Sequence, residues 1–394
     1  MRKKKSHKKY VLLGSGIGFM VCFFVLSYAI LPDFFRSSYE ALAQPSATTT
    51  QKIVPKRIVT HIPTPSAVKA IYMTSWVAGT SDIRRPLVSL IDETEINSVV
   101  IDIKDYTGEI SFEVNDPFLQ SVGSGSRRIV DIDDFIDLLH SKGIYVIGRI
   151  SVFQDQYFVK KHPEFAVKKN SDRTVPWADR KGIQWLDAGS HDVWDYIVAI
   201  GKEAYGRGFD ELNFDYIRFP SDGNMNDVYY PWSGTTTKSV VLNSFFEHIK
   251  SVFSPLSIPI SADLFGMTTT NTDDLNIGQV LEHALVNFDF VAPMVYPSHY
   301  PPGWNNFKDP ESYPYEVINI SMKAAVDRAN IIGVSPLKLR PWLQDFGLRM
   351  SYGAKEVKAQ IQATEDVGLT SWMLWNASNK YTKGALSQAS TTIQ

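Results

Sequence analysis

The sequence predicts an α/β fold, a (β/α)8 TIM barrel with loop insertions, preceded by a single N-terminal transmembrane helix and a flexible tether. Three observations predict the barrel. From residue 69 onward, short apolar runs alternate with longer stretches of helical periodicity, which is typical of β-α units around a parallel sheet. Eight such runs over a body of about 320 residues suit a closed barrel. The first run leads into WVAGT at 76–80, which lacks the Gly-rich phosphate turn of an open doubly wound sheet.

The predicted strands are the runs richest in apolar and β-branched residues. They span residues 70–76, 98–104, 144–151, 211–216, 259–264, 290–296, 339–345 and 371–375. Helical periodicity between them predicts helices over 86–94, 131–142, 191–207, 238–253, 277–285, 313–329 and 354–367. Ser190 is the expected N-cap of the third helix. A long insertion containing Trp177 and Trp185 follows the third strand.

Composition and charge exclude several classes of protein. The chain has 394 residues, 44% of them hydrophobic, so it can bury a large core and is not a disordered protein. Its net charge of −2 argues against a nucleic-acid-binding protein, and we expect no nucleic-acid partner. The single cysteine, Cys22, excludes disulfides and cysteine metal sites within one chain. We expect no cofactor.

The N-terminal region predicts where the protein works. Residues 1–9 form a basic cytoplasmic tail, and the uncharged run 10–31 is long enough to cross a bilayer as a helix. Because the basic flank lies N-terminal to this run, we expect a single-pass signal anchor in the cell membrane, with the N-terminus in the cytoplasm and the rest of the chain outside the cell. Cleavage of a signal peptide at 41–43, which would release a secreted protein, is the alternative.

Three further segments complete the predicted organisation. Residues 32–66 are rich in Pro, Thr and Ser and lack apolar periodicity, which is typical of an extended tether. Residues 67–382 form the predicted barrel domain. Residues 383–394 are a C-terminal tail.

Nearly every predicted strand ends in polar or aromatic residues. Because a TIM barrel builds its functional site at the carboxyl ends of its strands, we expect these residues to surround one site. In chain order they are Trp76, Asp102, Lys104, Asp105, Arg149, Asp215, Arg218, Asp263, Tyr296, His299, Gln344, Asp345, Trp375 and Asn376. Some of them are expected to make ordinary loop contacts instead.

Asp215 and Asp263 are the predicted catalytic pair. Asp215 shares the parity of Asn213 in the fourth strand, and Asp263 shares that of Ser261 in the fifth. If these small and polar residues face the barrel interior, both carboxylates emerge over its mouth, on strands about 5 Å apart. Such a pair suits glycoside hydrolysis, in which one carboxylate is ionised and the other donates a proton. We expect Arg218 to hold Asp215 in its ionised form.

Other interpretations of these carboxylates stay open. Asp215 could cap a turn or pair with Arg218 without a catalytic role. The strand-end carboxylates could hold a hard cation through their oxygens; these are Asp102, Asp105, Asp215 and Asp263. The acid role of Asp263 could fall to another carboxylate, first to Asp345 and otherwise to Glu109, Glu164 or Asp187. The histidines show no zinc-protease spacing, and we predict no metal site.

Five motifs are specific in combination and order. They are VIDIKD at 100–105, FDYIRFP at 214–220, SADLFG at 261–266, APMVYPSHY at 292–300 and WMLWN at 372–376. Together they resemble a bacterial family of glycosyl hydrolase domains of otherwise unknown function, and the resemblance covers about residues 67–380. It implies a (β/α)8 fold distantly similar to the α-amylase-type barrels, with Asp215 at the position of the fourth-strand nucleophile. The chain departs from that pattern at Asn213, in place of an arginine, and at Asp263, in place of a glutamate.

The resulting prediction is an exported, membrane-tethered glycoside hydrolase acting on a cell-envelope or extracellular polysaccharide or oligosaccharide. Trp76, Tyr296 and Trp375 are expected to stack on sugar rings. Asp102, Lys104 and Arg218 are expected to hold hydroxyl groups, and the other strand-end residues to line the substrate site. The alternatives are a barrel that binds glycan without cleaving it and a metal-dependent hydrolase.

Overall fold

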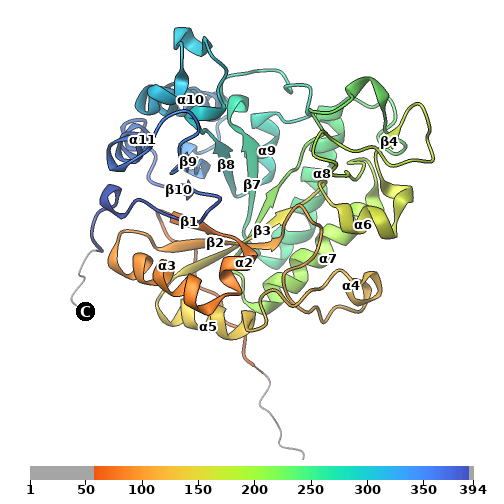
Figure 1. The fold of residues 1–394 in the computed structure, drawn as a ribbon, viewed down its shortest axis with the longest axis horizontal. Coiled ribbons are helices and arrows are strands. Elements are labelled where there is room, and N and C mark those ends of the chain that lie inside the picture. Colours follow the sequence, from red (N-terminus) through yellow and green to blue (C-terminus); the bar gives the residue numbers. More distant parts are fainter. Residues whose placement is uncertain (1–56, 390–394) are drawn as a thin grey trace, which may run out of the picture. The chain divides into compact units, whose positions relative to one another are not determined.

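The computed structural model describes residues 57–389, and its central feature is a closed barrel of parallel strands (Figure 1). The barrel strands are β1 (Lys69–Met73), β2 (Ser98–Lys104), β3 (Tyr145–Ser151), β5 (Glu211–Asp215), β7 (Ile260–Phe265), β8 (Phe290–Met294), β9 (Trp342–Gln344) and β10 (Trp372–Trp375). Around the barrel they follow the order β1-β10-β9-β8-β7-β5-β3-β2. Each predicted strand corresponds to one of these, so the predicted α/β barrel is confirmed.

Helices between the strands cover the outside of the barrel (Figure 1). The helices are α3 (Ser81–Glu93), α5 (Ile132–Ser141), α7 (His191–Arg207), α8 (Lys238–Phe253), α9 (Leu281–Asn287), α10 (Pro314–Ile331) and α11 (Ala354–Asp366). Shorter helices lie in the loops, namely α2 (Ser75–Ala78), α4 (Pro117–Val122) and α6 (Gln156–Lys161). The insertions after β3 and β5 pair through two short antiparallel strands, β4 (Lys168–Lys169) and β6 (Val228–Tyr229).

Two predicted helix starts are wrong, and one predicted N-cap is in place without a side-chain hydrogen bond. The first helix begins at Ser81, with Pro86 inside it rather than at its first position. The helix predicted from residue 277 begins at Leu281, because Asn276 and Gly278 take positive φ values of 56° and 87° that no α-helix accommodates. Ser190 precedes α7 as expected, yet its side chain makes no capping hydrogen bond.

Side chains alternate between the barrel interior and the helix layer. Ala70 and Tyr72 of β1 pack in an interior cluster with Tyr145, Tyr296 and Trp342. Neighbouring strand residues such as Leu212, Phe214 and Leu264 join the larger core between strands and helices. Asp215 and Asp263 alternate with these core residues along their strands, so their side chains face the barrel interior, as predicted.

The interior also carries a buried ion pair on the N-terminal side of the site. Arg340 Nη1 donates to Glu211 Oε2 at 2.8 Å, and both side chains are buried. Tyr145 donates its hydroxyl to the same carboxylate and contacts the Thr64 hydroxyl at 2.9 Å. Residues near the end of the predicted tether thus already contact the barrel.

The predicted cytoplasmic tail, the membrane-spanning run 10–31 and most of the tether lie outside the described residues and stay predictions. Within residues 57–389, none of the helices combines the length and apolar character that a membrane crossing requires.

Candidate active site

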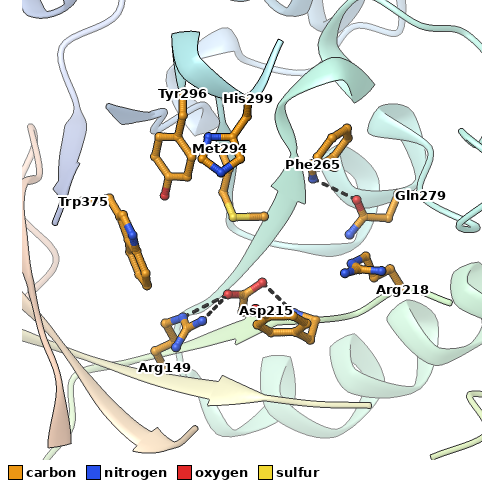
Figure 2. Close-up of a pocket in the computed structure, with 10 residues that line it drawn as sticks. Arg149, Asp215, Arg218, Phe265, Gln279, Met294, Tyr296, His299 and Trp375 are labelled. Atoms are coloured by element: carbon orange, nitrogen blue, oxygen red, sulfur yellow. Dashed lines mark hydrogen bonds and ion pairs between the residues drawn. The ribbon is translucent and has the colours of Figure 1, made fainter. Parts of the chain in front are cut away.

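A pocket of about 300 Å³ opens at the carboxyl ends of the barrel strands (Figure 2). Its lining residues are Arg149, Asp215, Tyr216, Arg218, Phe265, Gln279, Met294, Tyr296, His299 and Trp375. Six of these belong to the predicted set of strand-end residues, and they come from four different strands and the loops that follow them. Figure 2 shows Arg149 and Asp215 along one side of the pocket, with Tyr296 and His299 opposite and Trp375 between them.

Arg149 is the cation that pairs with Asp215. Its Nε and Nη2 donate to Asp215 Oδ2 at 3.0 and 2.5 Å, and its Nη1 donates to Asp102 Oδ1 at 2.6 Å. Burial works against a charged guanidinium here, but the carboxylates of Asp215 and Asp102 more than offset it and raise the pKa of Arg149. The guanidinium therefore stays charged and pairs with the carboxyl group of Asp215.

The prediction that Arg218 reaches Asp215 is wrong. Arg218 donates to the carbonyl of Phe219 and to the hydroxyl of Ser221, and its guanidinium packs 4.8 Å from the ring centre of Trp185. Burial lowers the pKa of Arg218. It forms part of the pocket wall and leaves the pairing to Arg149, which reaches Asp215 from the neighbouring strand β3.

The second oxygen of Asp215 is held by the backbone that follows it. Tyr216 has a φ of 52°, in the left-handed region that side chains other than glycine rarely adopt, and its N–H donates to Asp215 Oδ1 at 2.6 Å. Strain of this kind persists where the surrounding structure imposes it, and it is common at functional sites. Both oxygens of Asp215 therefore have fixed donors, so the carboxylate has a defined orientation in the pocket.

Asp263 lies beneath the pocket and is only 1% exposed. Asn213 Nδ2 and Trp342 Nε1 both donate to its Oδ1 at 2.9 Å, and its Oδ2 lies 3.9 Å from Arg149 Nε. Burial, together with the charge of Asp215, raises the pKa of Asp263 to about 8. Burial thus favours the protonated form of Asp263 beside the carboxyl group that pairs with Arg149.

The distances from Arg149 Nε to the two carboxyl groups set an upper limit on the separation of those groups. Asp215 Oδ2 and Asp263 Oδ2 lie 3.0 and 3.9 Å from Arg149 Nε, so they are no more than about 7 Å apart. Asn213, which stands where the amylase-type pattern has an arginine, donates to Asp263. Arg149 supplies the guanidinium beside Asp215 instead.

Tyr296 brings an unpaired hydroxyl to the same place. Its ring belongs to the interior cluster, and among the described residues its hydroxyl has no hydrogen-bond partner although it is buried. In Figure 2 this hydroxyl points into the pocket, toward the side on which Arg149 and Asp215 lie. A buried hydroxyl without a partner costs about 1–3 kcal/mol, a cost that a bound ligand would remove.

Three predicted residues after β1 and β2 make contacts away from the pocket. Lys104 forms a buried ion pair with Asp155 at 2.6 Å. Asp105 pairs with Arg128 at 2.8 Å. Trp76 is 64% exposed and stacks near the same Arg128 guanidinium. Asp102, by contrast, lies under the pocket, where it also accepts the Tyr72 hydroxyl at 2.5 Å.

The predicted residues after β9 and β10 hold loops together. Asp345 accepts hydrogen bonds from the backbone N–H and hydroxyl of Thr382 at 2.8 and 2.6 Å, which ties the C-terminal segment to the barrel. Asn376 donates to the carbonyls of Asp345 and Lys380. Gln344 accepts from the N–H of Ser298 at 3.0 Å. None of the three lines the pocket, and both oxygens of Asp345 are already held by Thr382. An acid role for Asp345 in place of Asp263 stays a prediction.

Sequence reasoning missed four residues that line the pocket. Tyr216, Phe265 and Met294 directly adjoin or end predicted strands and could have been found from that position. Gln279 lies in a loop, where its Oε1 accepts from the N–H of Phe265 at 2.8 Å, and the sequence carries no signal for it. In the part of the chain that the structure describes, no three His, Cys, Asp or Glu side chains gather as metal ligands would.

Comparisons with known proteins give one matching sequence family and several similar solved structures. A sequence family described as "Putative glycosyl hydrolase domain" matches residues 70–381. No functionally curated protein matches the chain. A crystal structure of a hypothetical protein from Ruminiclostridium thermocellum is 32% identical, over 52% of this chain and 98% of that one, with a TM-score of 0.44.

Two solved glycoside hydrolases are similar in fold. The PgaB (BpsB) glycoside hydrolase domain from Bordetella bronchiseptica has a TM-score of 0.58 at 14% identity, over 79% of this chain and 94% of that one. Alpha-L-fucosidase isoenzyme 2 from Paenibacillus thiaminolyticus has a TM-score of 0.52 at 11% identity, over 81% of this chain and 47% of that one.

Proposed function

Because the chain belongs to this family of glycosyl hydrolase domains, we propose that it cleaves a polysaccharide by a two-carboxylate mechanism centred on Asp215. One observation carries the proposal. Among the described residues that line the pocket, Asp215 is the only carboxylate, and both of its oxygens are fixed by donors from Arg149 and Tyr216. A carboxylate with a fixed orientation, beside aromatic rings suited to sugar faces, is what attack on an anomeric carbon requires.

The two carboxyl groups take different roles in this mechanism. Asp215, paired with Arg149, attacks the anomeric carbon while the glycosidic oxygen takes a proton from Asp263. Water then attacks the glycosyl ester and returns a proton to Asp263, which regenerates both groups. The upper limit of about 7 Å between their oxygens includes the roughly 5–5.5 Å that this retaining route needs and excludes most of the inverting range of about 6.5–9.5 Å.

Asp263 supplies its proton from beneath the pocket rather than from its wall. Its described hydrogen bonds all go to Oδ1, from Asn213 and Trp342, which leaves Oδ2 to carry the proton. Since burial holds that proton up to about pH 8, the acid is loaded at neutral pH. Trp375 and Tyr296 provide ring faces for the sugar in the pocket above.

The location of the enzyme rests on its N-terminal sequence. The basic residues 1–9 and the uncharged run 10–31 support an anchor in the cell membrane with the barrel exported, so that it meets cell-envelope or extracellular polysaccharide. Protease treatment of intact cells tests this. Digestion of the barrel with the cell unbroken is the expected result, and full protection would contradict it.

Activity is tested with a panel of chitosan, peptidoglycan, laminarin, cellulose and amylose, by release of reducing ends from the full-length protein and from Asp215→Asn. We expect one panel glycan to be cleaved by the wild type and not by the variant. Binding of a glycan without any product would favour the non-catalytic barrel, a reading that the deep position of Asp263 also supports. Loss of activity on chelation, restored by a divalent cation, would favour a metal-dependent hydrolase.

A further inference from the structure

A second cavity adjoins the pocket. It measures about 750 Å³ and is lined by Tyr106, Gln154, Gln156, Asp179, Lys181, Ile183, Tyr216, Arg218, Ser221 and Asp222. Two of these residues, Tyr216 and Arg218, line the first pocket as well. The two cavities therefore meet at one shared wall, and that wall begins at the residue directly after Asp215.

The second cavity is built by different loops from the first. Tyr106 follows β2, Gln154 and Gln156 follow β3, and Asp179 and Lys181 belong to the insertion after β3. The first pocket draws its aromatic residues from the ends of β5, β7, β8 and β10. Together the cavities use the ends of β2, β3, β5, β7, β8 and β10, and Asp215 lines the first of them directly beside the shared residue Tyr216.

The chemistry of the second cavity suits a neutral, hydroxyl-rich ligand. Its charges are mixed, with Lys181 and Arg218 against Asp179 and Asp222, so it favours neither an anion nor a cation. Gln154 is only 5% exposed, and among the described residues its buried Oε1 has no hydrogen-bond donor. An unpaired buried acceptor of this kind is satisfied by a ligand hydroxyl.

One exposed ring completes the cavity. Tyr106 lines the cavity and is 52% exposed, so its ring is free to stack against an apolar face of a ligand. Sugar rings present both an apolar face and hydroxyls at their edges. Tyr106 and Gln154 therefore offer the two kinds of contact that one sugar uses.

We propose that a single glycan chain occupies both cavities, so that the substrate is a polymer bound by several sugars and cleaved within the chain. The first pocket, at about 300 Å³, is at the small end of ligand sites, whereas the second is large enough for further sugars. The proposal rests on the proposed function of Asp215, because it places the reacting bond beside that residue at the junction of the cavities.

The test measures the dependence of binding and cleavage on chain length. Binding is measured by titrating oligomers of chitosan, laminarin, cellulose and amylose, from dimers to octamers, into the full-length Asp215→Asn variant. Cleavage is measured with the wild type on oligomers of whichever glycan it cleaves. We expect affinity and kcat/KM to rise with length. Tyr106→Ala should lower both by about tenfold for long oligomers and leave dimers unchanged. Lys181→Ala is a second variant in the same cavity.

A matched control separates a cavity effect from a general loss of stability. Leu256 is 51% exposed in the short turn Ser254–Leu256 after α8, outside both cavities, and Leu256→Ala should leave the length dependence intact. Cleavage at a rate that does not depend on oligomer length would overturn the proposal that one glycan spans both cavities, and that proposal alone. An equal fall in affinity and kcat/KM for dimers and octamers in Tyr106→Ala would have the same meaning. Length-dependent binding without cleavage would instead overturn the catalytic role of Asp215 and keep the extended site. Absence of binding by every oligomer would overturn both.

Discussion

Substitution of Asp263 by asparagine tests the proposed division of charge between the two carboxyl groups. Asparagine is close to a protonated aspartate in shape, and its carbonyl can still accept from Asn213 and Trp342. The unfolded chain loses the Asp263 proton near the ordinary pKa of 3.8, whereas the native protein keeps it to about pH 8. Between these values the native state binds one more proton than the unfolded state, so native stability falls as the pH rises.

The size of this effect follows from the same linkage. Relative to Asp263→Asn, the wild type should lose about 1.4 kcal/mol of unfolding free energy for each pH unit from about pH 4 to pH 8. Urea unfolding of both proteins, followed by tryptophan fluorescence at several pH values, measures the difference. The activity of the wild type should also decline as the pH rises through 8, when the acid loses its proton. Parallel stability curves for the two proteins would refute the reasoning.

Three other substitutions have defined outcomes. Arg149→Met leaves two buried carboxylates without their cation, so it should cost about 3–5 kcal/mol in urea unfolding and abolish activity; a variant as stable as the wild type would contradict the central role of Arg149. Lys104→Met should lower the free energy of unfolding by a similar amount, because Asp155 is left buried without its cation. Turnover per folded molecule should not change. A loss of turnover without a matching loss of stability would show that Lys104 contributes to the substrate site. Tyr296→Phe removes a hydroxyl that has no described partner, so stability should stay the same or rise while kcat/KM falls about tenfold; unchanged kinetics would show that the hydroxyl does not contact substrate.

The barrel was predictable because its signals are local. Each strand is a short run of apolar and β-branched residues, and each connection carries its own helical period, so order and type follow from the sequence. The side of the sheet to which each strand residue points was predictable for the same reason. Leu212 and Phe214 face the helices, and Asp215 faces the interior, as their alternation requires.

The partners of the strand-end residues depend on register and backbone geometry that the sequence does not reveal. The β2–β3 register shifts between Asp102 and Lys104, which pairs Lys104 with Ile150 and turns it toward Asp155 instead of the pocket. Tyr216 takes a positive φ that nothing in its side chain predicts, and the chain after it carries Arg218 away from Asp215. Arg149 reaches Asp215 instead, from a strand more than sixty residues earlier.

The residues that line the second cavity could not be predicted from the sequence for a related reason. Tyr106 comes from the loop after β2, and Gln154 and Lys181 come from the segment after β3; only the fold brings all three beside Tyr216. Long loops placed by a rigid barrel often carry binding residues, but which ones meet is a tertiary property.

The most direct test of the central claim is the rate at which the full-length protein releases reducing ends from the cleaved panel glycan, compared with Asp215→Asn. The variant keeps the shape of the side chain and can keep the hydrogen bond from Tyr216, but its amide nitrogen replaces the oxygen that accepts from Arg149. Its unfolding free energy is therefore measured as a check on folding. We predict that the folded variant loses activity by about a thousandfold or more while it still binds the glycan. Turnover equal to that of the wild type would contradict the account.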